Sequence, residues 1–163
     1  ALSVPGVTSV SILDRHPRGQ GTVDIVVRGS DVLPTEALLE KVRAAIAPNV
    51  SINDDWLVKG PAPVNCAIAG SLEYTEGDPE IIRMQAENRI RALFAETSPI
   101  AGVKALAIGQ DLTLDLLTHT VMAVPGVKRV DWDSPSETVV QVPADGVARM
   151  ESLDLSTVMA EEI

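Results

Sequence analysis

The stretch Val4-Pro5-Gly6-Val7-Thr8-Ser9-Val10 decides the fold, because it returns about 120 residues later as Val124-Pro125-Gly126-Val127-Lys128-Arg129-Val130. The similarity continues beyond this core, where residues 21–27 correspond to residues 137–142. Each copy reads as a turn, a strand, a hairpin and a second strand. The chain is therefore predicted to use one supersecondary unit twice.

The composition is that of an acidic chain with an aliphatic core. Of the 163 residues 45% are hydrophobic but 2% are aromatic, so Val, Leu, Ile and Ala must fill the core, which suits sheets covered by helices. The net charge of -10 argues against a nucleic-acid partner, because phosphate binding needs clustered Lys and Arg. It equally argues against docking on an anionic membrane surface. No apolar run approaches the ~20 residues that a membrane span requires.

Periodic patterns predict an α+β fold made of two small sheet-plus-helix units. We expect helices at 34–46, 78–96 and 112–123, and strands at 7–14, 22–28, 56–59, 64–74, 103–108, 127–132, 137–143 and 148–155. A hairpin connection is expected at Pro17-Arg18-Gly19-Gln20-Gly21, a break at Gly29-Ser30-Asp31 and a frayed end at 160–163.

The segment Gly60-Pro61-Ala62-Pro63 is the best boundary between units, because it carries two prolines and a glycine. We predict a first α+β unit at 1–61 and a second at 62–163. In the second copy of the repeat, Met122-Ala123 ends a predicted helix, and residues 1–3 stand at the same place in the first copy. We therefore expect the first unit to be truncated at its N-terminus and the chain to be a C-terminal piece of a longer protein.

The histidines do not suggest a metal or catalytic site. His16 falls in the hairpin connection and His119 on a helix, at positions that do not correspond in the two copies. Metal sites require clustered ligands at defined spacing. Both histidines are interpreted as ordinary loop and helix residues.

The carboxylates are interpreted as solvated. Asp24 is expected on the exposed face of its strand, and Asp54 and Asp55 in a turn. Asp131 and Asp133 share one strand face, where a carboxylate pair could hold a cation or act as an acid/base pair. No third ligand lies nearby in the sequence, so the solvated face of an edge strand is the better interpretation.

The remaining candidate groups do not indicate a reactive site either. Gly19-Gln20-Gly21 joins two strands, whereas a phosphate cradle wants a strand-to-helix turn. Cys66 is the single cysteine and lies in an apolar context, so it is predicted to be a buried strand residue. No catalytic, cofactor-binding or metal-binding residue is predicted, and no cofactor is expected.

The order of these motifs resembles the baseplate J-like proteins, wedge components of contractile phage tails and related injection machines. The resemblance rests on the Pro-Gly-Val turn and its strand, then Gly21-Thr22-Val23-Asp24-Ile25-Val26-Val27, then Asn53-Asp54-Asp55-Trp56-Leu57-Val58 and Ala67-Ile68-Ala69-Gly70-Ser71-Leu72. It continues where the helix at 112–123 runs into Val124-Pro125-Gly126-Val127. At Leu106-Ala107-Ile108-Gly109 the sequence departs from the pattern, where a more polar helix entry is expected.

The resemblance implies a structural wedge-subunit fragment of a bacteriophage or prophage contractile-tail baseplate. It implies no enzyme activity, assembly with other baseplate and tail proteins, and a place in the virion tail after assembly in the host cytoplasm. A tandem small-molecule-binding regulatory module is the alternative. It predicts a polar pocket with convergent donors between the units, near Pro5-Gly6 and Pro125-Gly126. An enzyme, the third possibility, predicts clustered carboxylates or histidines with shifted pKa values.

Overall fold

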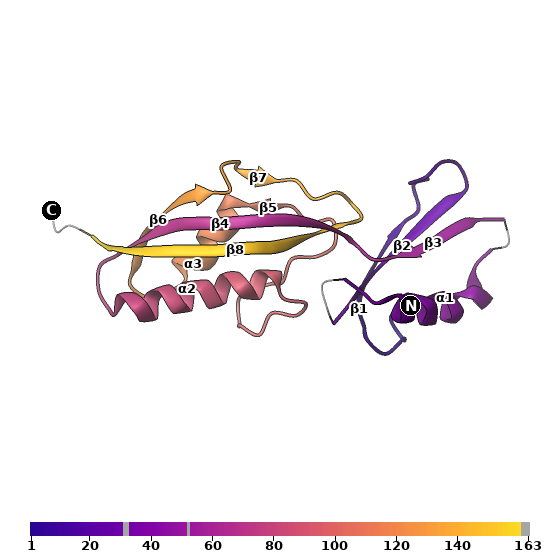
Figure 1. The fold of residues 1–163 in the computed structure, drawn as a ribbon, viewed down its shortest axis with the longest axis horizontal. Coiled ribbons are helices and arrows are strands. Elements are labelled where there is room, and N and C mark those ends of the chain that lie inside the picture. The colour runs from indigo at the N-terminus through magenta and orange to yellow at the C-terminus, as the bar shows by residue number, and fades with distance from the viewer. Residues whose placement is uncertain (31–32, 52, 161–163) are drawn as a thin grey trace. The chain divides into compact units, whose positions relative to one another are not determined.

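Figure 1 shows a computed structural model, which describes residues 1–30, 33–51 and 53–160. The chain divides into two compact units. The first combines Ala1–Val64 with two later segments, Ala107–Gln110 and Val142–Val147, and the second holds the rest of the described chain. The predicted boundary at residue 61 places both later segments in the second unit. The division into domains at 1–61 and 62–163 stays a prediction.

The first unit is built on a sheet with the strand order β1-β2-β3. β1 (Val7–Leu13) and β2 (Thr22–Gly29) form the predicted antiparallel hairpin, whereas β3 (Asp55–Lys59) runs parallel to β2. Parallel neighbours need a crossover connection. Here α1 (Glu36–Ile46) and the short 3-10 helix η1 (Ala47–Asn49) provide it.

Side chains alternate along β2, so this strand has two faces. Val27, on one face, packs with Val4, with Leu39 and Val42 of α1 and with Val58 of β3. The other face contains Thr22, Asp24, Val26 and Arg28, and all four are buried. Three of these four side chains are polar or charged. The first sheet therefore buries charged groups as well as apolar ones.

The second unit is built on a sheet in which β4 (Ala62–Tyr74) lies between β6 (Val127–Ser134) and β8 (Gly146–Met159). β4 and β6 are antiparallel. Gly70 lies in the middle of β4, and a Cβ atom there would approach the Asp131 carbonyl oxygen of β6 to 2.6 Å. A glycine is therefore required where these two strands meet.

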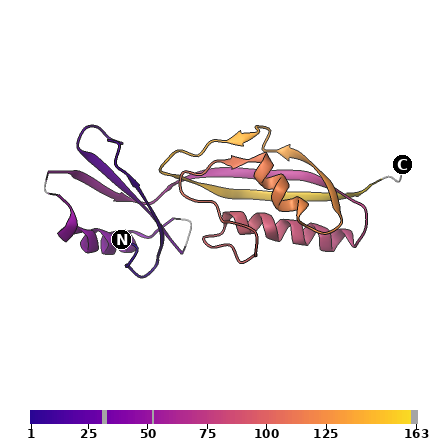
Figure 2. The same cartoon turned by 180° about the vertical axis from the view of Figure 1, so that it is seen from behind.

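Two helices complete the second unit. Asp78 caps α2 (Pro79–Phe94) by accepting hydrogen bonds from the N–H groups of Glu80 and Ile81, and Thr113 caps α3 (Leu114–Met122) in the same way. Figure 2 shows α3 in front of the strands. A two-stranded sheet of β5 (Leu112–Thr113) and β7 (Val139–Val140) accompanies them.

The core of the second unit is aliphatic, as the composition predicts. Its buried residues include Ile68 and Leu72 of β4, Ile82, Ala86, Ile90 and Leu93 of α2, Leu117 and Val121 of α3, and Leu155 of β8. Within the described residues, no helix combines the length and apolar character that crossing a membrane would require.

The repeated turn has the same geometry in both copies, which confirms this part of the predicted repeat. The Val7 N–H donates to the Val4 carbonyl at 3.1 Å, and the Val127 N–H donates to the Val124 carbonyl at 3.3 Å. Gly6 and Gly126 have φ angles of +94° and +89°. Proline followed by a glycine with positive φ defines a type II turn.

The strand pairing after the turn differs between the copies. After Gly6 the chain forms the β1–β2 hairpin, but after Gly126 the strand β6 pairs with β4, and β7 pairs with β5. The predicted second hairpin is therefore wrong. β4 already offers a long partner edge, so β6 pairs with it across the second unit.

The strand predicted at 103–108 is also wrong, because these residues, all of them described, contain no strand. Val103 and Leu106 are buried, and the Leu106 N–H donates to the Leu93 carbonyl at the end of α2. The apolar residues thus anchor a loop to the helix. Two further predictions fall partly outside the described residues, namely the break at Asp31 and the frayed end after Ala160.

Candidate functional site

A buried ion cluster centred on Asp24 lies on the sheet face of the first unit that is opposite Val27. The Asp24 residue is 1% exposed. Its Oδ1 lies 2.6 Å from Nε of Arg18, and its Oδ2 lies 2.9 Å from Nζ of Lys59. The prediction that Asp24 is exposed is therefore wrong. Alternation along β2 predicts two faces, but it does not predict that cations from other segments cover the polar one.

The cluster extends to two further carboxylates. Nη1 of Arg18 lies 2.7 Å from Oδ2 of Asp55, at the start of β3. Nζ of Lys59 lies 2.7 Å from Oδ2 of Asp145, which is 86 residues away in the sequence. Each cation therefore bridges the buried Asp24 to a more exposed carboxylate.

These contacts shift the pKa values of all three central groups. Burial alone raises the pKa of Asp24, but the hydrogen bond from Arg18 and the ion pair with Lys59 outweigh it and leave this pKa below its ordinary value. The hydrogen bond to Asp145, followed by the ion pair with Asp24, raises the pKa of Lys59. The hydrogen bonds to Asp24 and Asp55 raise the pKa of Arg18. All three groups are held in their charged forms, so none is poised for proton transfer near neutral pH.

The hairpin connection that holds Arg18 is fixed by its own polar groups. The Arg18 N–H donates to Oγ1 of Thr22, and the Thr22 hydroxyl donates to the Gly19 carbonyl at 2.6 Å. Nδ1 of His16 accepts from the Gly21 N–H, and His16 adopts a φ of +53°. His16 and Gly19-Gln20-Gly21 thus shape a turn.

The other candidate residues take no part in the ion pairs of this cluster. His119 is exposed in the last turn of α3, in the other unit from His16. Asp131, on the edge strand β6, has a 56% exposed side chain and pairs with Arg129 at 2.6 Å. Asp54 and Asp133 are exposed, and the described residues contain no group of three or more His, Cys, Asp or Glu placed to hold a metal ion.

Cys66 is a buried residue of β4, as predicted, and is 3% exposed. Burial raises the pKa of its thiol, and this outweighs the opposing backbone hydrogen bond near Arg149. The thiolate form is therefore suppressed, which is the opposite of what a nucleophilic cysteine needs.

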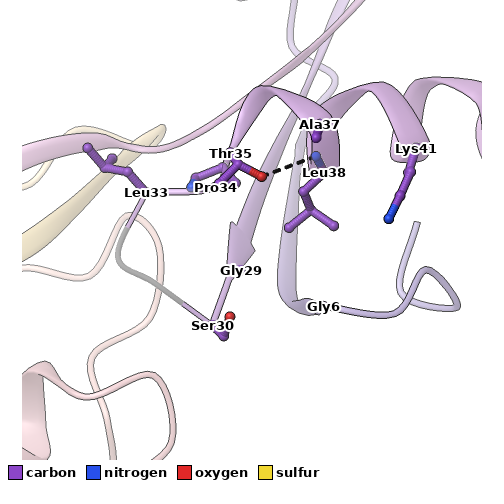
Figure 3. Close-up of a pocket in the computed structure, with 9 residues that line it drawn as sticks. All are labelled: Gly6, Gly29, Ser30, Leu33, Pro34, Thr35, Ala37, Leu38 and Lys41. Carbon is purple, nitrogen blue, oxygen red and sulfur yellow. Dashed lines mark hydrogen bonds between the residues drawn. The ribbon is translucent and has the colours of Figure 1, made fainter.

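Two shallow hollows lie beside the repeated turns, one in each unit. The first, of about 220 Å³, lies next to Gly6, and the Leu38 side chain points into it (Figure 3). Its polar side chains are those of Ser30, Thr35 and Lys41, and the Thr35 hydroxyl already accepts from the Leu38 N–H to cap α1.

The second hollow, of about 240 Å³, lies next to Pro125 and is lined partly by Gln85, Asn88 and Arg89. Nε of Arg89 already donates to the Thr120 carbonyl at 2.8 Å. In each hollow one polar side chain, Thr35 or Arg89, is thus already hydrogen-bonded to the backbone of a helix. Neither hollow lends support to the small-molecule alternative.

An apolar pair on α2 is the clearest candidate contact surface. Ile81 and Met84 lie one turn apart and are 50% and 54% exposed. Two ion pairs flank them, Arg83 with Glu80 at 2.5 Å and Arg91 with Glu87 at 3.0 Å. Single exposed apolar side chains are ordinary. An apolar centre with a polar rim whose charges are already paired has the anatomy of a protein–protein interface.

Comparisons with known proteins agree with this architecture. The model of the baseplate J-like central domain matches residues 1–69, and the model of the baseplate J-like protein C-terminal domain matches residues 67–156. A search of curated proteins gives no match.

Among solved structures, a chain in the "Cryo-EM structure of the anti-feeding prophage (AFP) baseplate, 6-fold symmetrised" has a similar fold, with a TM-score of 0.60 at 13% sequence identity. The match covers 91% of the present chain and 34% of that chain. The present chain thus spans about a third of the length of its structural neighbour. Since the two family models follow one another and together cover residues 1–156, the chain belongs to the baseplate J-like family.

Proposed function

We propose that this chain is a structural component of a bacteriophage or prophage contractile-tail baseplate, a wedge-subunit fragment that acts through protein–protein assembly. The observation that carries the proposal is the match of two baseplate J-like domain models, in order, over residues 1–156. The fold shared with a chain of a prophage baseplate supports it.

The physical character of the chain fits a part that is built into an assembly. The first unit combines an apolar core around Val27 with a network of paired charges, and the second has an aliphatic core. Such units keep their surfaces in a fixed shape, which reduces the entropy lost on binding. The apolar pair Ile81 and Met84 provides one surface for a neighbour.

The proposal includes no enzymatic activity. The shifted pKa values of the ion cluster hold its groups charged, and the raised pKa of Cys66 disfavours its nucleophilic form. We further propose that its partners are other baseplate and tail proteins, and that it resides in the tail after assembly in the host cytoplasm. A net charge of -10 argues against nucleic acid and anionic lipid as partners.

Deleting the coding region of this chain from a genome that makes the tail tests the proposal. We expect negative-stain electron microscopy to show no complete sheathed tails, and a plasmid copy to restore them. Complete tails in normal number after deletion would contradict a structural role. Tails that are intact but inactive would favour an enzymatic or regulatory role.

A surface variant sharpens this experiment. Ile81→Glu combined with Met84→Glu places charges in the apolar pair of α2, and we expect the number of complete tails to fall while circular dichroism stays unchanged. Gln85→Glu is the matched control, because it adds a charge at an exposed position of the same helix and removes no apolar contact. Tail numbers at the unmodified level for the double variant would show that this face is not an interface.

A further inference from the structure

The ion cluster connects segments that are far apart in the sequence. The Asp24 carboxylate is buried in the central strand, and one of its two cations, Lys59, is shared with Asp145. Asp145 belongs to Val142–Val147, a segment of the first unit that is separated from Lys59 by more than half of the chain. We call this segment the strap.

The strap is attached by backbone as well as side-chain contacts. The Ala62 N–H donates to the Asp145 carbonyl at 2.9 Å, and the Gly109 N–H donates to the Gly146 carbonyl at 2.8 Å. Val142 and Val147, its two ends, are 6% and 0% exposed. The strap is therefore a packed part of the first unit.

The physical chemistry of a buried carboxylate makes the strap important. A carboxylate that loses water must be paired with well-placed cations, because an unpaired buried charge is strongly unfavourable. Lys59 has a long side chain with many rotamers, and holding it in one of them costs entropy. Asp145 binds the same ammonium at 2.7 Å, so the strap helps to hold the cation that Asp24 needs.

We propose that the strap is a conformational lock, so that the β1-β2-β3 sheet reaches its native packing only once Val142–Val147 has docked on it. Most of the first unit comes early in the chain, at Ala1–Val64. Its sheet would nevertheless reach its native packing only after the strap has been synthesised. This inference goes beyond the proposed function and does not rest on it, because its basis is the contacts of Asp24, Lys59 and Asp145.

Hydrogen exchange on the full chain tests the lock at equilibrium. Asp145→Asn keeps the shape and the backbone carbonyl but removes the charge. We expect the amides of β2 and β3, and that of Ala62, to exchange about tenfold faster or more. The amides of β4 beyond Ile68 should keep their exchange rates. Asp131→Asn is the matched control, since it removes an exposed carboxylate from the Arg129 pair, and we expect it to leave the β2 and β3 rates unchanged.

Two outcomes would overturn the lock. One is unchanged exchange in β2 and β3 of Asp145→Asn. The other is an equal increase in both units, which would mean that the substitution lowers global stability without acting on the first sheet. Lys59→Arg keeps a cation between the two carboxylates, and we expect it to retain most of the protection that Asp145→Asn loses.

Pulse-labelling hydrogen exchange during refolding of the unmodified chain tests the order of events and needs no variant. We expect the Asp55 amide, which donates to the Gly21 carbonyl at 2.9 Å, to become protected in the same phase as the Ala62 and Gly109 amides that bind the strap. Native protection of Asp55 and β2 in an earlier phase would overturn the proposal.

Discussion

Trp132 donates a hydrogen bond from Nε1 to Oγ1 of Thr118 at 2.9 Å, and this bond joins the edge strand β6 to helix α3. Both residues are half-buried. Val130 lies on the same face of β6 as Trp132, and it pairs with Leu72, which is 0% exposed. The indole thus connects the helix to the sheet. Its N–H is hydrogen-bonded, as that of a buried Trp usually is.

Thr118→Val is expected to lower the free energy of unfolding by about 1–2 kcal/mol, because it keeps the side-chain shape but leaves the Trp132 N–H without its acceptor. Urea unfolding followed by Trp fluorescence measures this change. Thr97→Val, at an exposed loop position, is the control and should change stability by less than about 0.5 kcal/mol. A Thr118→Val protein as stable as the control would show that the bond contributes little.

Gly126→Ala is expected to be far more damaging than Gly102→Ala. Both glycines have positive φ, +89° and +80°, so each alanine meets backbone strain of about 1 kcal/mol or more. At Gly126 the new Cβ would also lie 2.4 Å from the Glu76 carbonyl oxygen, whereas nothing lies within 4 Å at Gly102. We expect a loss above about 3 kcal/mol for Gly126→Ala, measured as the shift in the urea midpoint. Equal midpoints would contradict the close approach.

The ion cluster predicts a stability that depends on acid pH. The pKa of Asp24 is lowered in the folded chain, so its contribution is fully present above the ordinary carboxyl pKa. It is lost as the pH falls through the lower folded value. The free energy of unfolding should therefore fall as the pH drops below about 4.

Asp24→Asn should weaken this fall of the free energy of unfolding at acid pH. At neutral pH it should destabilise the chain by about 3 kcal/mol, because Arg18 and Lys59 lose their shared buried carboxylate. Chemical unfolding at a series of pH values measures both effects. Asp131→Asn should leave the pH profile close to that of the unmodified chain. If the free energy of unfolding falls equally steeply below a pH of about 4 in both variants, the pH dependence belongs to other carboxylates.

Cys66 should resist alkylation in the folded chain. Burial raises the pKa of its thiol, so the thiolate is scarcer at a given pH than in an exposed cysteine, and β4 packing blocks access. We expect iodoacetamide at pH 8 to label the native chain at least about tenfold more slowly than the urea-unfolded chain, with mass spectrometry as the readout. Similar rates in both states would mean that β4 opens readily.

Local sequence signals predicted the parts of the fold that local interactions determine. The Val-Pro-Gly-Val turns adopt one geometry because proline fixes φ at one position and glycine permits a positive φ at the next. Helices α1, α2 and α3 begin at the Thr and Asp caps that their sequences offer. These features need no knowledge of distant partners.

Predictions failed where a distant segment decides the outcome. Alternation predicted Asp24 on the exposed face of β2, but Lys59 and Arg18 pair with its carboxylate and Asp24 is buried. The repeat predicted a second hairpin, but β6 pairs with β4. Val103 and Leu106 read as a strand, yet their burial anchors a loop to α2. In each case tertiary packing overrides the local pattern.

The interleaving of the two units has a consequence for how genes of this kind can exchange parts. The first unit draws on Ala1–Val64, Ala107–Gln110 and Val142–Val147. A recombination event that replaced only codons 1–64 would import a new Lys59 and keep the resident Asp145. Such a hybrid must match both residues by chance. Exchange of the complete coding region keeps Lys59 and Asp145 together, so it preserves their ion pair.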